Sequence, residues 1–159
     1  YLAQAPIVDL PVDLQNDLPT PSLVLTAGKG DVYNSSIWLG NAPTYTPLHR
    51  DPNPNLFVQL VGQKVVRLFR PDIGRAILAK VHEQIGSSGS ATIRGEEMMQ
   101  GAEKKALMGE VWSNDADYLG HCWQAELDSG DALYIPKGWW HSVKGTGSGI
   151  IGSVNWWFR

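Results

Sequence analysis

TYTPLHRDPNPNLFVQLVGQKVVRLFRP, residues 44–71, is the stretch of this chain that decides its fold. Two apolar runs, NLFVQLV and KVVRLFR, flank a Gly-Gln turn, a pattern that predicts two strands paired as a hairpin. Polar residues interrupt this pattern, because His49 and Asp51 precede the first run and Lys64 opens the second. Packing alone does not explain an imidazole, a carboxylate and an ammonium group in the core strands of a protein.

Short apolar runs separated by turn residues continue through the rest of the chain. Further strands are predicted in SLVLT (22–26), DVYNSSIWLG (31–40), TYTPLHRD (44–51), CWQAELDSGDALYIPKGWWHSVKG (122–145) and GIIGSVNWWFR (149–159). PDIGRAILAKV (71–81) predicts one short helix, since Pro71 and Asp72 suit a first helical turn. About eight short strands with little helix predict an all-β fold with minor helix, built on a double-stranded β-helix core (jelly roll, cupin).

The length of 159 residues fits one domain. We expect a single catalytic domain over residues 1–159, with an irregular insertion at about 82–121 that holds one helical stretch within residues 95–111. The chain opens on YLAQ, which is neither an initiator methionine nor a signal peptide, so we expect it to be part of a longer parent chain.

Composition excludes several functional classes. The net charge of −3 gives no broad basic surface, so direct binding of nucleic acid is not expected. Cys122 is the single cysteine, which excludes a disulfide framework and a thiolate zinc cluster. One unpaired cysteine suits an intracellular protein, nuclear or cytoplasmic. No run of eighteen apolar residues is present, so no membrane span is expected. The sequence leaves the oligomeric state open.

A candidate metal site comes from three residues. His49 and Asp51 are two apart in a predicted strand and therefore share a face. His141, in PKGWWHSV, comes from a late strand that a barrel can bring across to them. Two histidines and a carboxylate can hold one face of octahedral Fe(II) and leave three positions open. The alternative also stays open: His49 and Asp51 could be a surface pair, and His141 could simply lie in a strand that begins after a turn.

Lys64 shares one strand face with Val66 and Leu68. Because Lys64 is the only charged residue on this face, we expect the face to point inward. A buried ammonium group is unfavourable unless an anion meets it. An anion bound near Lys64 and Asn55, which lies on the neighbouring strand, would explain both residues. The alternative is a lysine that follows a turn and extends to solvent.

Three segments together resemble a known family: TPLHRDPNPNLFVQLVGQKVVRLFRP, GDALYIPKGWWHSVKG and SVNWWF. They are similar to the JmjC (Jumonji C) domains of cupin-type 2-oxoglutarate- and Fe(II)-dependent oxygenases. The hydroxylase-like subgroup typified by Jumonji domain-containing protein five is the most similar. The resemblance runs over residues 1–159 and is weakest between about 74 and 121.

The resemblance implies roles for individual residues. It makes His49, Asp51 and His141 the catalytic iron ligands, and pairs Lys64 with the distal carboxylate of 2-oxoglutarate. Asn155 departs from the pattern, because the subgroup has a smaller polar residue at this position.

The same resemblance supplies the rest of the predicted pocket. Tyr1 and Thr46 would give hydroxyl hydrogen bonds to the distal carboxylate, and Asn55 would touch the other end of the cosubstrate. Trp38 and Trp157 match aromatic positions that line the substrate pocket.

The implied reaction is hydroxylation of a protein or peptide side chain, arginyl in the nearest subgroup. Fe(II) is the metal cofactor, and O₂ and 2-oxoglutarate are consumed as the side chain gains one oxygen atom and succinate and CO₂ are released. Two alternatives stay open. One is a JmjC N-methyl-lysine histone demethylase, in which hydroxylation of the methyl group releases it. The other is a catalytically inactive cupin binding module, against which the complete set of His49, Asp51, His141 and Lys64 argues.

Overall fold

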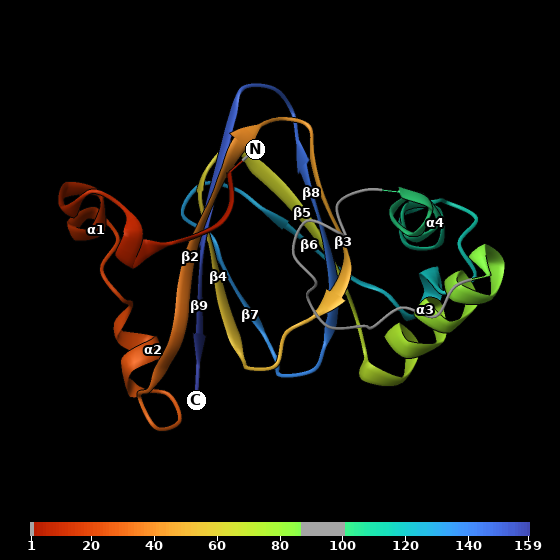
Figure 1. Ribbon diagram of the computed structural model, residues 1–159, viewed down its shortest axis with the longest axis horizontal. Coiled ribbons are helices and arrows are strands. Elements are labelled where there is room, and N and C mark those ends of the chain that lie inside the picture. Colours follow the sequence, from red (N-terminus) through yellow and green to blue (C-terminus); the bar gives the residue numbers. More distant parts are fainter. Residues whose placement is uncertain (1, 87–100) are drawn as a thin grey trace.

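A computed structural model describes residues 2–86 and 101–159 of the chain, and in this part nine strands form two antiparallel sheets (Figure 1). Sheet A has the strand order β1 (Leu2–Pro6), β2 (Val32–Asn41), β9 (Ile150–Phe158), β4 (Asn55–Val61) and β7 (Ala132–Ile135). Sheet B has the order β3 (Thr44–Arg50), β8 (Trp140–Thr146), β5 (Gln63–Phe69) and β6 (Trp123–Leu127). Two facing sheets with these crossovers confirm the predicted jelly-roll, cupin-type core.

The helices lie on the outer faces of the two sheets (Figure 1). On the sheet A side are η1 (Ile7–Asp9), α1 (Val12–Asp17) and α2 (Ser22–Thr26). On the sheet B side are α3 (Pro71–Ile85), α4 (Gly101–Trp112) and η3 (Leu119–His121). Within the residues described, no helix has the length and apolar character needed to cross a membrane.

Three apolar clusters hold these layers together. One fills the space between the sheets and is formed by Phe57, Val66, Leu68, Leu127, Ile135 and Val143. A second packs the N-terminal helices on sheet A and is formed by Ile7, Val24, Leu56, Val154, Trp156 and Phe158. The third packs α3 and α4 on sheet B and includes Leu48, Phe69, Ile77, Val81, Leu107 and Trp140. The strands at the middle of each sheet are therefore buried on both faces.

The predicted hairpin between the two apolar runs is wrong. The runs do form β4 and β5, but β4 pairs with β7 and β9 in sheet A, whereas β5 pairs with β6 and β8 in sheet B. The chain passes from one sheet to the other at Gly62, whose φ of 72° lies in the left-handed region. A Cβ atom there would lie 2.8 Å from the carbonyl oxygen of Ile150. A short turn between two apolar runs predicts the strands, but the pairing partners come from distant segments.

Two further local predictions differ from the structure. SLVLT forms α2 instead of a strand, because Pro21 precedes its first turn and Val24 is the residue that it buries. The segment 82–121 is also less irregular than predicted, since α3 extends to Ile85 and α4 occupies residues 101–112. The rest of this segment, residues 87–100, lies outside the described part of the chain.

Gly74 lets α3 approach the sheet next to the candidate site. A Cβ atom at this position would lie 2.0 Å from Cγ of the buried Trp140. We therefore expect Gly74→Ala to lower the free energy of unfolding by about 3 kcal/mol or more, measured by urea denaturation. Gly109→Ala is the matched control, because nothing lies within 4 Å of its Cβ and a helical alanine should stabilise α4 by about 0.5–1 kcal/mol. Equal effects of the two substitutions would contradict this packing argument.

Candidate metal and cosubstrate site

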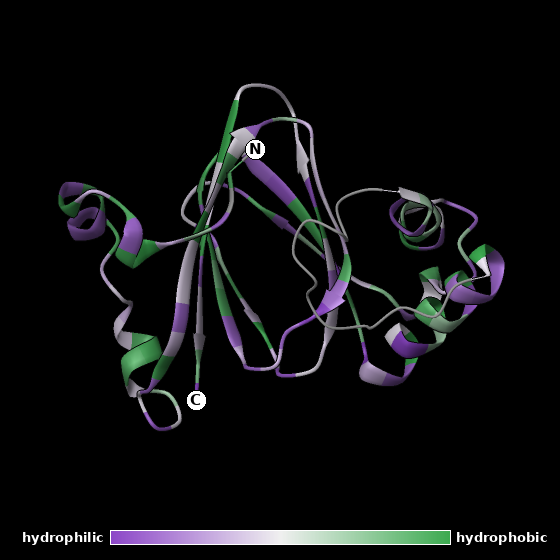
Figure 2. Ribbon diagram, viewed as in Figure 1, coloured by the Kyte–Doolittle hydropathy of each residue, from purple (hydrophilic) through white to green (hydrophobic). Residues whose placement is uncertain are grey.

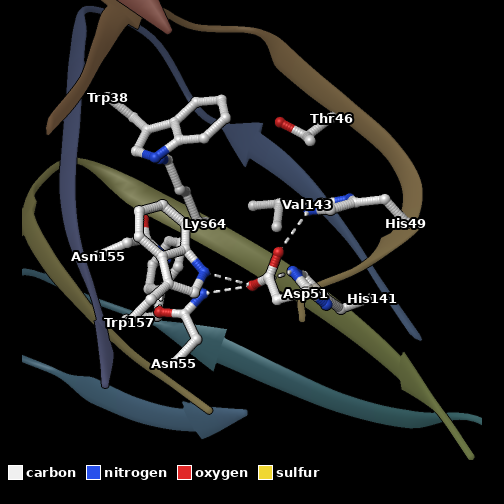
Figure 3. Close-up of a pocket in the computed structure, with 11 residues that line it drawn as sticks. Trp38, Thr46, His49, Asp51, Asn55, Lys64, His141, Val143, Asn155 and Trp157 are labelled. Carbon is white, nitrogen blue, oxygen red and sulfur yellow. Dashed lines mark hydrogen bonds and ion pairs between the residues drawn. The ribbon is translucent and has the colours of Figure 1, made fainter. Parts of the chain in front are cut away.

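A polar pocket lies between the two sheets, with an empty volume of about 330 Å³ that includes its opening to solvent. The residues that line it are Trp38, Thr46, His49, Asp51, Asn55, Phe57, Lys64, His141, Val143, Asn155 and Trp157. Figure 3 shows these side chains converging from strands of both sheets. Eight of the nine predicted site residues are thus brought together, and the ninth, Tyr1, lies outside the described residues. In Figure 2 the end of β3 and the beginning of β5 are hydrophilic, although both lie within sheet B.

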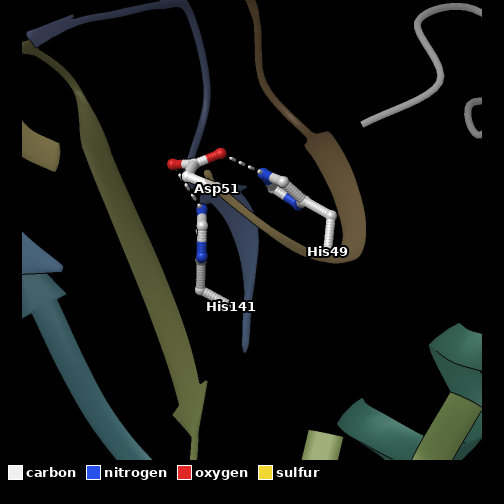
Figure 4. A group of neighbouring side chains, drawn as sticks. All are labelled: His49, Asp51 and His141. Carbon is white, nitrogen blue, oxygen red and sulfur yellow. Dashed lines mark ion pairs between the residues drawn. The ribbon is translucent and has the colours of Figure 1, made fainter. Parts of the chain in front are cut away.

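Strand pairing brings the three candidate metal ligands together (Figure 4). His49 on β3 is the direct partner of His141 on β8, and Asp51 follows β3 by one residue. All three side chains are buried, and their ligand atoms lie within 4.8 Å of one another. Nε2 of His49 is 3.9 Å from Oδ1 of Asp51, and Nε2 of His141 is 3.7 Å from Oδ2. The three residues present two imidazoles and one carboxylate to a common point.

Both imidazole rings are oriented for binding a metal through Nε2. Nδ1 of His49 lies 2.9 Å from the carbonyl oxygen of Pro47, and Nδ1 of His141 lies 3.3 Å from that of Trp139. A proton on Nδ1 that is donated to a carbonyl leaves a lone pair on Nε2, which is the usual arrangement of a histidine ligand. Burial and the neighbouring His49 lower the pKa of His141 to about 4, so the ring is neutral at pH 7.

The carboxylate of Asp51 is held by two donors. Nδ2 of Asn55 and Nε1 of Trp157 both donate to Oδ2, each at 2.8 Å. Oδ1 is buried and has no hydrogen-bond partner among the described residues. Burial alone would raise the pKa of Asp51, but His141, His49 and these two hydrogen bonds together hold it below its ordinary value. An ionised carboxylate with one unsatisfied buried oxygen, facing the imidazoles of His49 and His141, fits a divalent cation such as Fe(II).

Asn55 and Trp157 therefore have contacts that the sequence did not predict. Asn55 was expected at the cosubstrate, but its amide donates to Asp51, and its Oδ1 accepts a hydrogen bond of 3.0 Å from Nδ2 of Asn155. Trp157 was expected as a wall of the substrate pocket, yet its indole also orients Asp51. Asn155 gains a place in this network, which the sequence left unassigned. The roles predicted for Asn55 and Trp157 toward cosubstrate and substrate stay predictions.

Lys64 does not extend to solvent. Its side chain belongs to a residue that is 3% exposed, and Nζ donates a hydrogen bond of 2.5 Å to the hydroxyl of Ser153 and lies 5.2 Å from the ring centroid of Phe57. Burial lowers its pKa to about 8. A buried ammonium group with a neutral hydroxyl as its partner is well placed to receive an anion.

Ser153 is a hydrogen-bond partner of Lys64 that sequence reasoning missed. It is fully buried and lies on β9, where Ser153, Asn155 and Trp157 alternate with apolar residues of the opposite face. The signal was present in the sequence, since SVNWW places these three side chains two residues apart on one strand face.

Trp157→Phe should weaken metal binding while the fold is retained. The substitution removes the indole N–H that orients Asp51, and the loss of such an outer hydrogen bond lowers metal affinity by about 10- to 100-fold. The measurement is anaerobic titration with Fe(II) against a chromophoric chelator. Trp156→Phe is the control, because the indole of Trp156 packs in the apolar cluster on the outer face of sheet A. Equal metal affinities for the two variants would show that the indole of Trp157 does not position Asp51.

Comparison with known proteins agrees with the predicted resemblance to JmjC proteins. The chain is 28% identical over 158 residues to lysine-specific demethylase JMJ30 of Arabidopsis thaliana, covering 99% of this chain and 33% of that protein. It is 29% identical over 154 residues to JmjC domain-containing protein D of Dictyostelium discoideum, covering 91% and 32%. It is 28% identical over 164 residues to Jumonji C domain-containing protein 5 of Drosophila melanogaster, covering 100% and 36%.

The chain thus spans about a third of the length of these relatives. A family described as the cupin-like domain matches residues 2–159, which is nearly the whole sequence. Together with the two antiparallel sheets and the pocket between them, this match identifies the chain as a member of the cupin-like domain family.

Proposed function

We propose that this chain is a 2-oxoglutarate- and Fe(II)-dependent oxygenase domain that hydroxylates a side chain of a protein substrate. The observation that supports this most is one pocket that holds both His49, Asp51 and His141 and the buried Lys64. A structural metal site needs the first three residues but has no need of a buried ammonium group beside them. A carboxylate-binding pocket needs the lysine but has no need of the metal ligands.

Two groups of pocket residues would bind the metal and the cosubstrate. His49, Asp51 and His141 would hold Fe(II), and Lys64 would anchor the distal carboxylate of 2-oxoglutarate with the hydroxyls of Ser153 and Thr46 nearby. Bound Fe(II) supplies the oxidising chemistry with O₂, in which 2-oxoglutarate is converted to succinate and CO₂.

The protein contributes geometry and exclusion of water. Asn55 and Trp157 keep the carboxylate of Asp51 in one orientation, so the ligand set needs no rearrangement when the metal binds. Phe57 and Val143 give the pocket apolar walls, which strengthen the attraction between Lys64 and a bound anion.

The test of the proposal is anaerobic addition of Fe(II) and 2-oxoglutarate, followed by admission of air. We expect a weak visible charge-transfer band from the bound pair, and then succinate, quantified by NMR. His49→Ala should abolish both signals. A folded protein that binds Fe(II) but gives neither the band nor succinate would leave the inactive binding module as the better description.

The second candidate is demethylation of N-methyl-lysine. Similarity to lysine-specific demethylase JMJ30 and to lysine-specific demethylase 8 of Danio rerio, which is 25% identical over 145 residues, favours it. Mass spectrometry of substrate peptides separates the two outcomes. A hydroxylase adds one oxygen atom to the peptide, whereas a demethylase removes a methyl group and releases formaldehyde.

Affinity for 2-oxoglutarate should fall as the pH rises above about 8. Burial lowers the pKa of Lys64 to about 8 in the free protein, so the ammonium group that pairs with the distal carboxylate is lost above this pH. Below pH 8 the affinity should be constant, and above it the dissociation constant should rise by up to about tenfold per pH unit. The measurement is calorimetric titration with Mn(II) in place of Fe(II). Pyruvate, which lacks the distal carboxylate, is the control and should show no such dependence.

A further inference from the structure

Exposed basic residues surround the side of the pocket at which the metal ligands lie. Four segments meet there, 50–54, 70–75, 120–123 and 136–139, and we call them the rim. Their exposed charged residues are Arg50, Arg70, Arg75, Lys137 and Asp72, which is four positive charges against one negative charge. The whole chain has a net charge of −3, so the rim has the opposite sign to the protein as a whole.

Specific contacts tie these segments to one another and to the metal ligands. The backbone N–H of Gly138 donates to the carbonyl oxygen of Asp51 at 3.3 Å, which joins the turn of Lys137 to the β3 end. The guanidinium of Arg50 lies 6.0 Å from the ring centroid of Trp140, the residue before His141. The rim charges therefore lie at the strand ends that carry the ligands.

A groove continues from the rim along the start of β6. It is lined by Arg70, Asp72, Ile73, Gly120, His121, Cys122 and Trp123, and its empty volume, which includes open solvent, is about 800 Å³. Trp123 is 51% exposed and packs against Trp139 with ring centroids 5.2 Å apart. Strand pairing places Trp123 opposite Leu68, which is itself opposite His141. Neighbouring strands are about 4.8 Å apart, so Trp123 lies about 10 Å from a metal ligand in the same row.

The charged side chains that line this groove are those of Arg70 and Asp72, and Arg75 lies beside them on α3. Asp72 pairs with Arg70 at 3.5 Å, and both side chains are more than half exposed, so this ion pair is weak and open to exchange. Desolvation would raise the pKa of Asp72, but backbone hydrogen bonds, Arg70 and Arg75 on the next turn of α3 together hold it below its ordinary value. The N-terminal turn of α3, which begins at Pro71, adds the positive end of its helix dipole.

We propose that the rim and its groove dock an acidic segment of the protein substrate, adjacent in sequence to the residue that enters the pocket. This inference rests on the proposed function, because it assigns the substrate class of the same site. Carboxylates two to four residues from the modified residue would reach the guanidinium groups of Arg50 and Arg70, with Trp123 as the apolar floor. A lysine-rich segment would meet like charges, so the rim disfavours a basic tail as substrate.

A nucleic acid is the other polyanion that such a surface could attract. The described charges favour a peptide, because four cations around one opening do not form the extended stripe that follows a phosphate backbone, and the rest of the chain is acidic.

The test uses fluorescein-labelled Gly/Ser peptides that contain four Glu, four Gln or four Lys residues. Fluorescence anisotropy at low ionic strength reports their binding to the metal-free protein. We expect the Glu peptide to bind, the Gln and Lys peptides to bind at least about tenfold more weakly, and added salt to weaken the Glu complex. Because no metal is needed, the result is independent of the charge-transfer and succinate experiment, and either proposal can fail alone.

Matched charge reversals locate the binding. Arg70→Glu/Lys137→Glu changes two exposed rim residues, and Lys29→Glu/Lys105→Glu makes the same change of net charge at exposed positions elsewhere. The rim variant should lose at least about tenfold in affinity for the Glu peptide, and the control variant should lose much less. Equal losses would overturn the proposal, and so would stronger binding of the Lys peptide. A single-stranded DNA oligonucleotide that binds more tightly than the Glu peptide, and is released by the rim variant, would overturn it as well.

Discussion

Asp51→Asn should abolish Fe(II) binding and 2-oxoglutarate turnover without unfolding the protein. An asparagine can place its oxygen where Oδ2 of Asp51 accepts from Asn55 and Trp157, and this leaves an NH₂ group at the Oδ1 position, which faces His49. An NH₂ group has no lone pair for a metal. Loss of an outer hydrogen bond alone lowers metal affinity by about 10- to 100-fold, so loss of the ligand itself should exceed about 100-fold.

The measurement pairs metal affinity with stability. Competition against a chelator gives the Fe(II) affinity, and urea denaturation gives the free energy of unfolding of the metal-free protein. We expect the latter to change by about 1 kcal/mol or less, because both hydrogen bonds are kept while a buried charge is removed. Asp72→Asn is the control, since this carboxylate is exposed at the rim and should leave metal affinity unchanged. Wild-type metal affinity in a folded Asp51→Asn protein would remove Asp51 from the ligand set.

Local sequence pattern accounts for part of the arrangement of these residues. Side chains two residues apart share a strand face, so local pattern suggested both the pairing of His49 with Asp51 and an inward Lys64, while a surface pair and a solvent-exposed lysine stayed open as alternatives. His141 needed more, because nothing local places it against His49, and the resemblance of PKGWWHSV to JmjC domains supplied that contact. The structure agrees on all four positions in one pocket.

What the sequence could not predict depends on contacts between segments far apart in the chain. The β4–β5 hairpin was wrong because the turn at Gly62 joins two sheets, and only distant strand partners decide this. Trp157 was missed as a donor to Asp51 for the same reason, because it comes from β9. Asn55 lies only four residues after Asp51, and its contact was missed because its amide was expected at the cosubstrate. The basic rim could not be predicted from a sequence of net charge −3 either, since its four segments come together only in the folded protein.

Lys64→Met should raise stability and at the same time destroy cosubstrate binding. In the metal-free protein the buried ammonium group is offset by one neutral hydrogen bond, to Ser153. Methionine fills a similar volume without the charge, so the free energy of unfolding at pH 7 should rise by about 1 kcal/mol or more. The affinity for 2-oxoglutarate should fall by about 100-fold or more, because a buried charge pair to the distal carboxylate is lost.

The pH dependence of the free energy of unfolding gives a second test of the role of Lys64. The pKa of Lys64 is about 8 in the folded protein and 10.5 in its ordinary state, so the unfolded chain binds more protons between these values. Stability of the wild-type protein should therefore rise between pH 8 and 10.5 by an amount that Lys64→Met lacks. Lys105→Met, at an exposed position of α4, is the control for the charge change. A variant that is less stable than wild type at pH 7, or that binds 2-oxoglutarate normally, would mean that Lys64 serves the fold rather than an anion. Higher stability together with weaker binding of 2-oxoglutarate in Lys64→Met is the result expected if this buried charge serves to bind an anion rather than to stabilise the fold.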